Sequence, residues 1–518
     1  MTGRRHRPRG RIRAPRDAAP TRGALGAGSI ALISLAAVLT LRGFPVVAVY
    51  GWSSIALYVV GALVFFVPLA LVSAELATAW PRAGGVYAWV REAFGDRPGF
   101  LAVWFEWIEN VVWFPTVLSF VAAMAAYVVA PGLADDRAYL VVAMLAILWS
   151  LTLANLFGMR WTGRVNNPAL ILGTLAPAAL LIGLGAYWIA DGRASAIPFA
   201  PARLVPDLSG AGNLVFFAGV LLGYAGIEMT GFHAGETRDP ARDYPRAVFL
   251  AAGPIVGISI LGTLAIAIVV PRSELSLITG LPQAFAALFG ALGVGPWAAR
   301  LMAALTGLGT LALISTWLLG PAKGLYATGA SGDLPPRLQR VSRRHEPVAI
   351  LVAQGLLGSL FALLFLVVPS VDTSYWMLSA LTAQIVMVMY VLVFAAALRL
   401  RYTRPETLRP YRVPGGLPGI WLVAGLGIGG SAFGLVIGFV PPSGLAHWPT
   451  PVYVAAMAGG IAICSLPPFL IDRWKRPGWR IATPDAVLLG GPADASAGGG
   501  SPPGRAGGLT PLSPSPPA

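Results

Sequence analysis

Long apolar stretches alternate along the chain with short segments rich in charge, proline or glycine. A run of about 20 apolar residues can cross the hydrocarbon core of a bilayer as a helix, because each residue adds ~1.5 Å of rise. Twelve runs are predicted to span the membrane in this way: 25–45, 50–79, 99–130, 138–158, 165–190, 212–234, 246–270, 296–327, 348–368, 373–399, 417–440 and 451–471. The stretch 276–290 is apolar but short, which predicts a hairpin or an interfacial helix.

The positions of the basic residues predict the orientation of these spans. Of the 37 lysines and arginines, 31 lie in the tails and in alternate loops on the amino-terminal side, whereas five lie on the opposite side. Arg42, near the end of the first span, is counted on neither side. Because loops rich in Lys and Arg remain cytoplasmic, both termini of this multi-pass protein are expected in the cytoplasm, with the spans in the cell membrane.

Composition supports a membrane protein and narrows its partners. The 518 residues are 56% hydrophobic and 11% charged, against about 25% charged in soluble proteins. The net charge of +15 and the run "RRHRPRGRIRAPR" at 4–16 resemble a nucleic-acid-binding arm, but cytoplasmic retention of the tail accounts for them. The lipid bilayer is therefore the expected large partner, and no nucleic acid is expected.

Cofactor chemistry has little support in the sequence. The one cysteine, Cys464, lies inside an apolar span, and the four histidines are far apart, so a disulfide framework, a zinc site and any other metal or cofactor site are not predicted. The chain lacks a G-x-x-x-x-G-K-[ST] phosphate loop, which argues against an ATP-driven pump.

The segment after Trp479 is rich in Gly, Pro, Ser and Ala and is expected to be disordered.

The sixth span contains the segment "GYAGIEMTGF" at 223–232, in which three glycines surround Glu228. Three glycines cost a continuous helix roughly 3 kcal/mol relative to alanine, and a carboxylate at mid-membrane adds about 2.5 to 3.5 kcal/mol. A helix that is broken here explains both features, because glycine adopts unusual backbone angles and broken ends expose polar backbone groups. Close packing of helices through small residues is the alternative explanation of the glycines.

Three motifs follow one another on the side predicted to be cytoplasmic. They are "SAELATAWPRAGGVYAWVREAFGDRPGF" at 73–100, "HAGETRDPARDYPRA" at 233–247 and "GPAKGLYATGASGDLPP" at 320–336. Together they resemble the amino acid-polyamine-organocation (APC) transporter superfamily, and the resemblance covers residues 25–473. The segments "YAGIEMTGFHAGETRDPARDYP" and "STWLLGPAKGLY" are most similar to the bacterial glutamate/GABA antiporter branch.

The resemblance implies an all-α integral membrane protein with twelve transmembrane helices. Its core is a five-plus-five inverted repeat like that of the leucine transporter, in which helices 1 and 6 are discontinuous near the bilayer midplane. The expected parts are a basic cytoplasmic tail (1–24), repeat 1 (25–190), an extracellular loop (191–211), repeat 2 (212–401), helices 11 and 12 with their preceding loop (402–473), and a disordered cytoplasmic tail (474–518).

The implied function is secondary transport of an amino acid or close derivative by alternating access, as an exchanger or a proton-coupled permease. An end of a broken helix can bind a carboxylate through its N–H groups or an ammonium group through its carbonyls. The residues expected to bind substrate are Val38, Leu39, Thr40, Gly223, Tyr224, Ala225 and Gly226. The first span lacks the Gly-Ser-Gly-like signature common in the family, so its own residues do not predict a break. An amino-acid sensor of the same fold is the alternative, and the oligomeric state stays open.

Several ionisable residues inside the spans are candidates for proton coupling or gating. Glu228 matches an acidic position of the family's sixth helix, with a structural hydrogen bond that braces the unwound backbone as the alternative role. Tyr390 matches an aromatic position of the tenth helix. Glu106 and Glu109 share one helix face, so one of them is expected to stay neutral or to pair with a cation, unless both belong to a buried polar packing network.

Two further charges and several aromatic residues have open roles. Arg42 can pair with one of the glutamates, contact an acidic substrate, or extend to the outer interface. Glu75 is expected to stabilise the inward-facing gate region. The antiporter branch carries a tyrosine at the position of Arg42 and a glutamate at that of Leu313, so these two residues argue against an acid-resistance exchange. Aromatic candidates for closing the pocket are Trp107, Trp113, Tyr224, Trp317, Trp376 and Tyr390.

Overall fold

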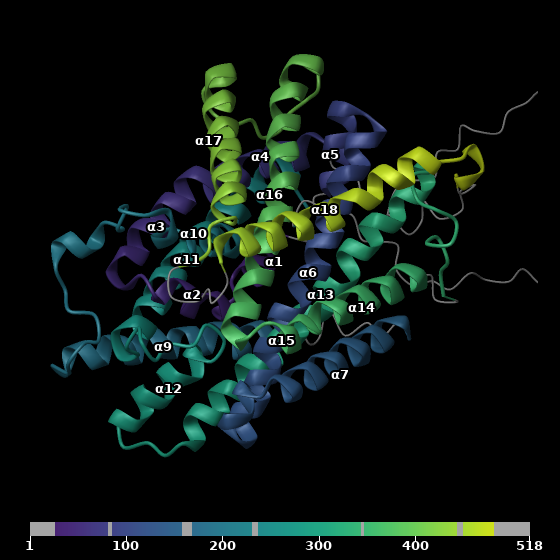
Figure 1. Cartoon of the computed structure of the whole chain (residues 1–518). Coiled ribbons are helices and arrows are strands. Elements are labelled where there is room, and N and C mark those ends of the chain that lie inside the picture. Colours follow the sequence, from purple (N-terminus) through teal and green to yellow (C-terminus); the bar gives the residue numbers. More distant parts are fainter. Residues whose placement is uncertain are drawn as a thin grey trace, which may run out of the picture.

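The computed structural model describes residues 26–80, 85–157, 168–229, 237–342, 346–442 and 449–480. Within these ranges, twelve helical segments are long and apolar enough to cross a membrane, which confirms the predicted spans (Figure 1). The amino-terminal tail to residue 25, residues 81–84 and 233–236 of two motifs, Gly231 and all four histidines lie outside the described residues.

Several spans consist of more than one helix. The first contains α1 (Ala27–Val38) and α2 (Phe44–Ala48), the second α3 (Ser54–Gly61) and α4 (Val67–Ala79), the sixth α10 (Phe217–Gly223), and the ninth α14 (Val348–Ala362) and α15 (Leu364–Val367). The others are α6 (Asp96–Val129), α7 (Arg137–Leu156), α9 (Ala176–Ala190), α11 (Pro240–Val269), α13 (Trp297–Ala327), α16 (Val371–Thr403), α17 (Gly416–Ile437) and α18 (Thr450–Trp474). Two shorter helices, α5 (Gly85–Phe94) and α12 (Gly280–Ala291), connect spans. Of the two alternatives expected over 276–290, a hairpin or an interfacial helix, the structure shows a short helix.

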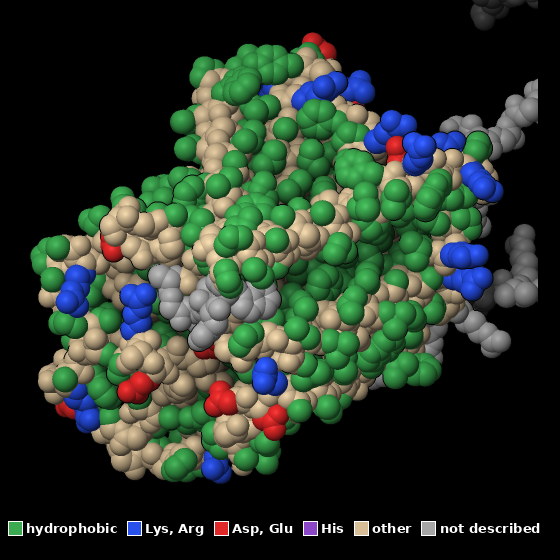
Figure 2. All heavy atoms as spheres, viewed as in Figure 1, with side chains coloured by type: hydrophobic (Ala, Val, Ile, Leu, Met, Phe, Trp, Pro, Cys, Tyr) green, Lys and Arg blue, Asp and Glu red, His purple; other side chains and the backbone are tan. Residues whose placement is uncertain are grey.

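Helices α6 and α16 form the centre of the bundle. Their most apolar windows are 83% and 78% buried, and they pack against each other, with α13 and α5 also against α6 and α17 also against α16. The outer surface is suited to lipid: Figure 2 shows a largely hydrophobic face whose charged side chains gather near its margins. A helix that is buried on nearly all sides can carry polar residues that would be costly against lipid.

Two spans contain a π-helical turn that ends two residues before a proline. The turns cover Ala62–Phe66 and Ile171–Leu175, and Pro68 and Pro177 follow them. Proline has no N–H to donate and its ring clashes with the carbonyl four residues earlier, so a wider turn lets the helix continue without breaking. Spans two and five therefore each contain one wider helical turn and continue as helices beyond it.

A buried ion-pair network joins the second span to the tenth on the predicted cytoplasmic side. The Nε and Nη2 atoms of Arg401 each donate to the Glu75 carboxylate at 2.6 Å, and Arg409 Nε lies 3.1 Å from it. The backbone N–H of Val413 donates to the same carboxylate at 2.8 Å. Glu75 is thus held by α16 and by the segment that follows it, and its expected gate role remains a prediction.

The residues after α18 contact the segment after α13. Lys475 pairs with Asp333, and Gln339 Nε2 donates to the Trp479 carbonyl at 2.7 Å. Burial raises the pKa of Asp333, and the contact with Lys475 acts in the opposite direction. Residues 474–480, which were assigned to the disordered tail, are therefore placed on the protein, and those from 481 lie outside the described ranges.

Candidate functional site

The first span is interrupted after Val38. Leu39 and Thr40 are extended, with φ/ψ of −73°/112° and −134°/127°, and the chain resumes with a 3₁₀ turn at Leu41–Gly43 before α2. A β-branched residue such as Thr40 is well suited to extended backbone. The predicted discontinuity of helix 1 is therefore present, although no glycine lies in the extended part.

The sixth span is interrupted after Gly223, where Tyr224, Ala225 and Gly226 form a turn. Gly226 has φ +107°, a region that residues with a Cβ rarely adopt. A Cβ at this position would also lie 3.2 Å from the Trp317 ring. The break therefore requires glycine at 226. At Gly223, by contrast, an added Cβ would have no neighbour within 4 Å, and the backbone does not have a positive φ.

Glu228 and Tyr390 hold the backbone of the second break. The Gly226 N–H donates to Glu228 Oε2 and to the Tyr390 hydroxyl, both at 3.1 Å. The Tyr390 hydroxyl in turn donates to Glu228 Oε1 at 2.9 Å. This is the bracing contact expected as one role of Glu228, and its part in proton coupling remains a prediction.

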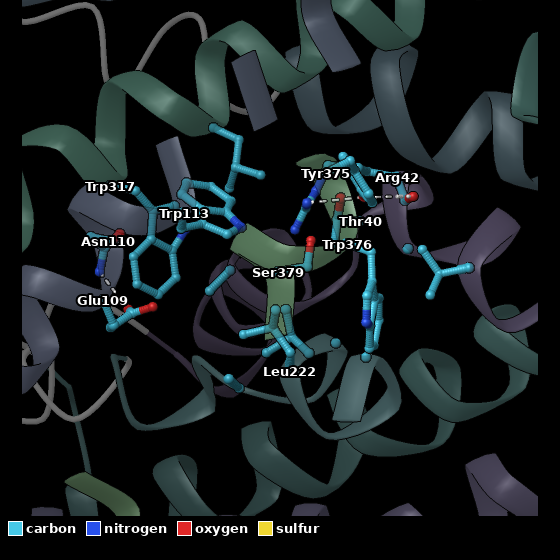
Figure 3. A pocket seen from close by; sticks show the side chains of 18 residues that line it. Thr40, Arg42, Glu109, Asn110, Trp113, Leu222, Trp317, Tyr375, Trp376 and Ser379 are labelled. Carbon is cyan, nitrogen blue, oxygen red and sulfur yellow. Dashed lines mark hydrogen bonds between the residues drawn. The ribbon is translucent and has the colours of Figure 1, made fainter. Parts of the chain in front are cut away.

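A cavity of about 80 Å³ lies between the two breaks. This is several times the ~10–15 Å³ that one water needs. It is lined by Ala37, Val38, Thr40, Arg42, Gly43 and Val46 of the first span, Gly219, Leu222, Gly223 and Ala225 of the sixth, Glu109, Asn110 and Trp113 of α6, Leu313 and Trp317 of α13, and Tyr375, Trp376 and Ser379 of α16. The structure thus gathers four of the seven predicted binding residues around one space (Figure 3).

The other predicted binding residues lie at the breaks but do not line this cavity. Tyr224 points toward the second span, because its hydroxyl donates to the Tyr58 carbonyl at 3.1 Å and its ring stacks on Phe66 at 4.7 Å. Leu39 is buried in the core, and Gly226 contributes its backbone to the brace. These three residues position the break.

Arg42 lies inside the protein and faces the cavity. Its Nη1 donates to Thr116 Oγ1 at 2.9 Å and to the Tyr375 hydroxyl at 3.1 Å, and its guanidinium lies 5.5 Å from the Trp113 ring centroid. The residue is only 5% exposed, so it does not extend to the outer interface. No carboxylate of the described residues pairs with it, and its Nε is buried without a partner. Contact with an acidic substrate, the third expected role, stays a prediction.

Glu109 faces the same cavity from α6. Its Oε1 accepts from Asn110 Nδ2 at 2.6 Å, and Figure 3 shows it on the opposite side of the cavity from Arg42, with the Trp113 and Trp317 rings nearby. The cavity therefore carries a guanidinium group and a carboxyl group at separate positions.

Trp107, one of the aromatic candidates for closing the pocket, does not line the cavity. Its indole N–H donates to Gln354 Oε1 at 3.0 Å.

Sequence reasoning missed four polar residues of this site. Asn110, Tyr375 and Ser379 line the cavity, and Thr116 holds Arg42. Their spacing carries a signal, because residues 110, 113 and 116 of α6, like 375 and 379 of α16, recur at the interval of three or four that places side chains on one helix face. Reading each buried helix for a polar face would have found them.

The comparisons with known proteins agree with this arrangement. A family model described as amino acid permease matches residues 25–463. The chain belongs to the amino acid permease family. The permease is 41% identical over 445 residues to an uncharacterized transporter of Legionella pneumophila, which covers 86% of this chain and 96% of that protein. It is 31% identical over 442 residues to a glutamate/gamma-aminobutyrate antiporter of Lactococcus lactis, covering 84% and 87%.

The fold has a solved counterpart. The crystal structure of MhsT in complex with L-phenylalanine superimposes with a TM-score of 0.57 at 15% identity, covering 80% of this chain and 99% of that one. The permease therefore has the leucine-transporter-like fold that was expected. Family and fold together make it a secondary transporter, and they do not favour the sensor alternative.

Proposed function

We propose that this permease moves an amino acid or close derivative across the cytoplasmic membrane by exchange or proton-coupled symport, with both termini in the cytoplasm. The observation that carries the proposal is the cavity between two broken helices, with Arg42 and Glu109 at separate positions in its wall. The similarity to a glutamate/gamma-aminobutyrate antiporter supports a substrate with both an acidic and a basic group.

The helix ends around the cavity favour a defined orientation of such a substrate. Val38 and Gly223 are the last residues of α1 and α10 and both line the cavity. The carboxyl end of a helix presents free carbonyls and partial negative charge, and Glu109 adds a carboxyl group whose oxygens can accept hydrogen bonds. The ammonium group of the substrate is therefore proposed to lie near Glu109 and these two helix ends. The carboxylate of the substrate is proposed to lie near Arg42. Leu222 and Leu313 provide apolar wall between.

Counterflow in proteoliposomes tests the proposal. Vesicles that contain the purified permease are loaded with unlabelled amino acids, amines or dipeptides, and entry of the labelled compound is followed while internal and external pH are varied separately. At least one zwitterionic amino acid or derivative is expected to show counterflow. Saturable binding without flux of any compound would instead support the sensor.

Arg42→Gln is expected to weaken binding of substrates that carry a carboxylate by about 10- to 100-fold, because a charge-assisted hydrogen bond contributes roughly 1.5 to 3 kcal/mol. The half-saturation concentration in counterflow measures this, for an amino acid and for its decarboxylated amine. Arg300→Gln, at an exposed position of α13, is the matched control. Equal losses for the acid and the amine would assign Arg42 to packing.

Tyr390→Phe is expected to slow transport by about tenfold while membrane abundance stays unchanged. The substitution removes the hydroxyl that bridges Gly226 and Glu228, and a lost hydrogen bond of about 1 to 1.5 kcal/mol corresponds to roughly that factor. Initial counterflow rates per milligram of purified protein give the measurement. Tyr139→Phe removes a hydroxyl of α7 that donates to the Ala122 carbonyl, outside the cavity wall, and serves as control. A wild-type rate in Tyr390→Phe would mean that the brace does not contribute to turnover.

A further inference from the structure

Glu106 is a buried carboxyl group without a partner. It lies on α6 one turn before Glu109 and is 3% exposed. Both of its carboxylate oxygens are buried and accept no hydrogen bond from the residues that the structure describes. The Asn110 amide, one turn further along α6, donates to the Glu106 backbone carbonyl and to the Glu109 side chain instead.

The ionisable groups near Glu106 are acidic. Glu109 lies one turn further along the same helix, and Glu228 of the sixth span interacts electrostatically with both Glu106 and Glu109. Other titratable groups on the elements packed against α6 include Tyr390 of α16, which donates to Glu228, and Cys464 of α18, which is buried. Tyr375 and Asp372 of α16 accept hydrogen bonds from Arg42 and Ser276. Four cations on those elements have other partners: Arg91 pairs with Asp96, Lys323 with Glu346, Arg401 with Glu75, and Arg137 donates to the Val368 carbonyl. Three more, Arg300, Arg399 and Arg473, are exposed.

This environment excludes an ionised Glu106 in the conformation observed. A carboxylate buried without a hydrogen bond or a cation costs several kcal/mol, and nearby carboxylates add repulsion. A neutral carboxyl group avoids most of that penalty. Glu106 therefore holds a proton here, and it can release that proton only when the surroundings open to water.

The three buried carboxylates differ in their partners. Glu228 accepts from Gly226 and Tyr390, and Glu109 accepts from Asn110 and faces the cavity. Glu106 has neither a brace nor a place in the cavity wall. Because α6 begins at Asp96 on the predicted cytoplasmic side, Glu106 lies about 4.5 Å closer to that side than Glu109 does.

We propose that Glu106 is the proton carrier of this permease, which binds one proton with each substrate and releases it toward the cytoplasm as transport completes. The step moves H⁺ onto and off one carboxylate oxygen and needs no other reactant. The proposal rests on the proposed transport function and adds the coupling ion and its residue.

Glu106→Gln tests it in the full chain, because glutamine imitates the neutral carboxyl group but cannot release a proton. Two assays are run on the same proteoliposomes: counterflow at equal pH, and accumulation of labelled substrate under an inward proton gradient, with a pH-sensitive dye inside. With one proton per substrate, wild type is expected to accumulate about tenfold per pH unit. Glu106→Gln is expected to keep counterflow within about twofold and to lose both the accumulation and the dye signal.

Each failure has a separate meaning. Wild type without counterflow of any compound would overturn the proposed function itself. Wild-type counterflow without a response to the proton gradient, or gradient-driven accumulation by Glu106→Gln equal to wild type, would overturn the role of Glu106 and leave transport intact. If Glu106→Gln loses counterflow, Glu106→Asp decides: restored coupled uptake supports a titrating group, whereas continued loss of counterflow would assign Glu106 to packing and overturn the proposal.

Discussion

Glu75→Ala is expected to destabilise the permease by about 3 to 5 kcal/mol, the range measured when one partner of a buried ion pair is removed. The side chains of Arg401, Arg409 and Glu75 are only 1%, 6% and 3% exposed. Without the carboxylate, two guanidinium groups would face each other in the protein interior, and the Val413 N–H would lose its acceptor. The temperature at which the detergent-solubilised protein loses its monodisperse peak measures the effect.

Two further variants make this result specific. Glu92→Ala removes the partner of Arg404 in a pair that is partly exposed, and it is expected to change stability by less than about 1 kcal/mol. The triple variant Glu75→Leu, Arg401→Met and Arg409→Met replaces all three charged side chains by apolar ones and is expected to recover much of the loss. If Glu75→Ala and Glu92→Ala lose their monodisperse peak at the same temperature, the buried ion-pair network contributes little to stability, and its position between the second and tenth spans is incidental.

The twelve spans could be predicted because the bilayer imposes a length and a composition on each of them. Both predicted discontinuities are present, but only one was visible in the residues. Gly226 adopts a backbone angle that requires glycine, and a cluster of glycines around a carboxylate points to that kind of geometry. The break at Leu39 and Thr40 has no such local signal and was expected from family resemblance alone.

Long-range contacts explain why the first break escapes local reasoning. Just after it, Arg42 donates to Thr116 and Tyr375, 74 and 333 positions away in the chain. Nothing in "VLTLRG" indicates these partners, because they come from other spans. The same limit applies to Tyr224: its place beside a glycine break indicated the cavity, whereas packing against Tyr58 and Phe66 directs it elsewhere.

Gly226→Val is expected to reduce transport by about 10- to 100-fold or more, because backbone strain at a non-glycine residue of this conformation costs roughly 1 to 3 kcal/mol. Crowding adds to the strain: the new Cβ would lie 3.2 Å from the Trp317 ring and 3.4 Å from the Ala37 carbonyl oxygen. Relief of either contact would move α1 or α13 away from the cavity. The initial rate of counterflow per milligram of purified protein is the measurement.

Gly183→Ala provides the matched control, since this glycine of α9 has no neighbour within 4 Å of an added Cβ and lies outside the cavity wall. It is expected to transport at the wild-type rate. Gly226→Ala should fall between the two, because it adds the strain but less of the bulk. A graded loss from Ala to Val with intact membrane abundance would tie transport to the geometry of the second break. Wild-type rates for both variants would show that this turn can relax without cost, and the cavity between the breaks would then have to be formed by other parts of the bundle.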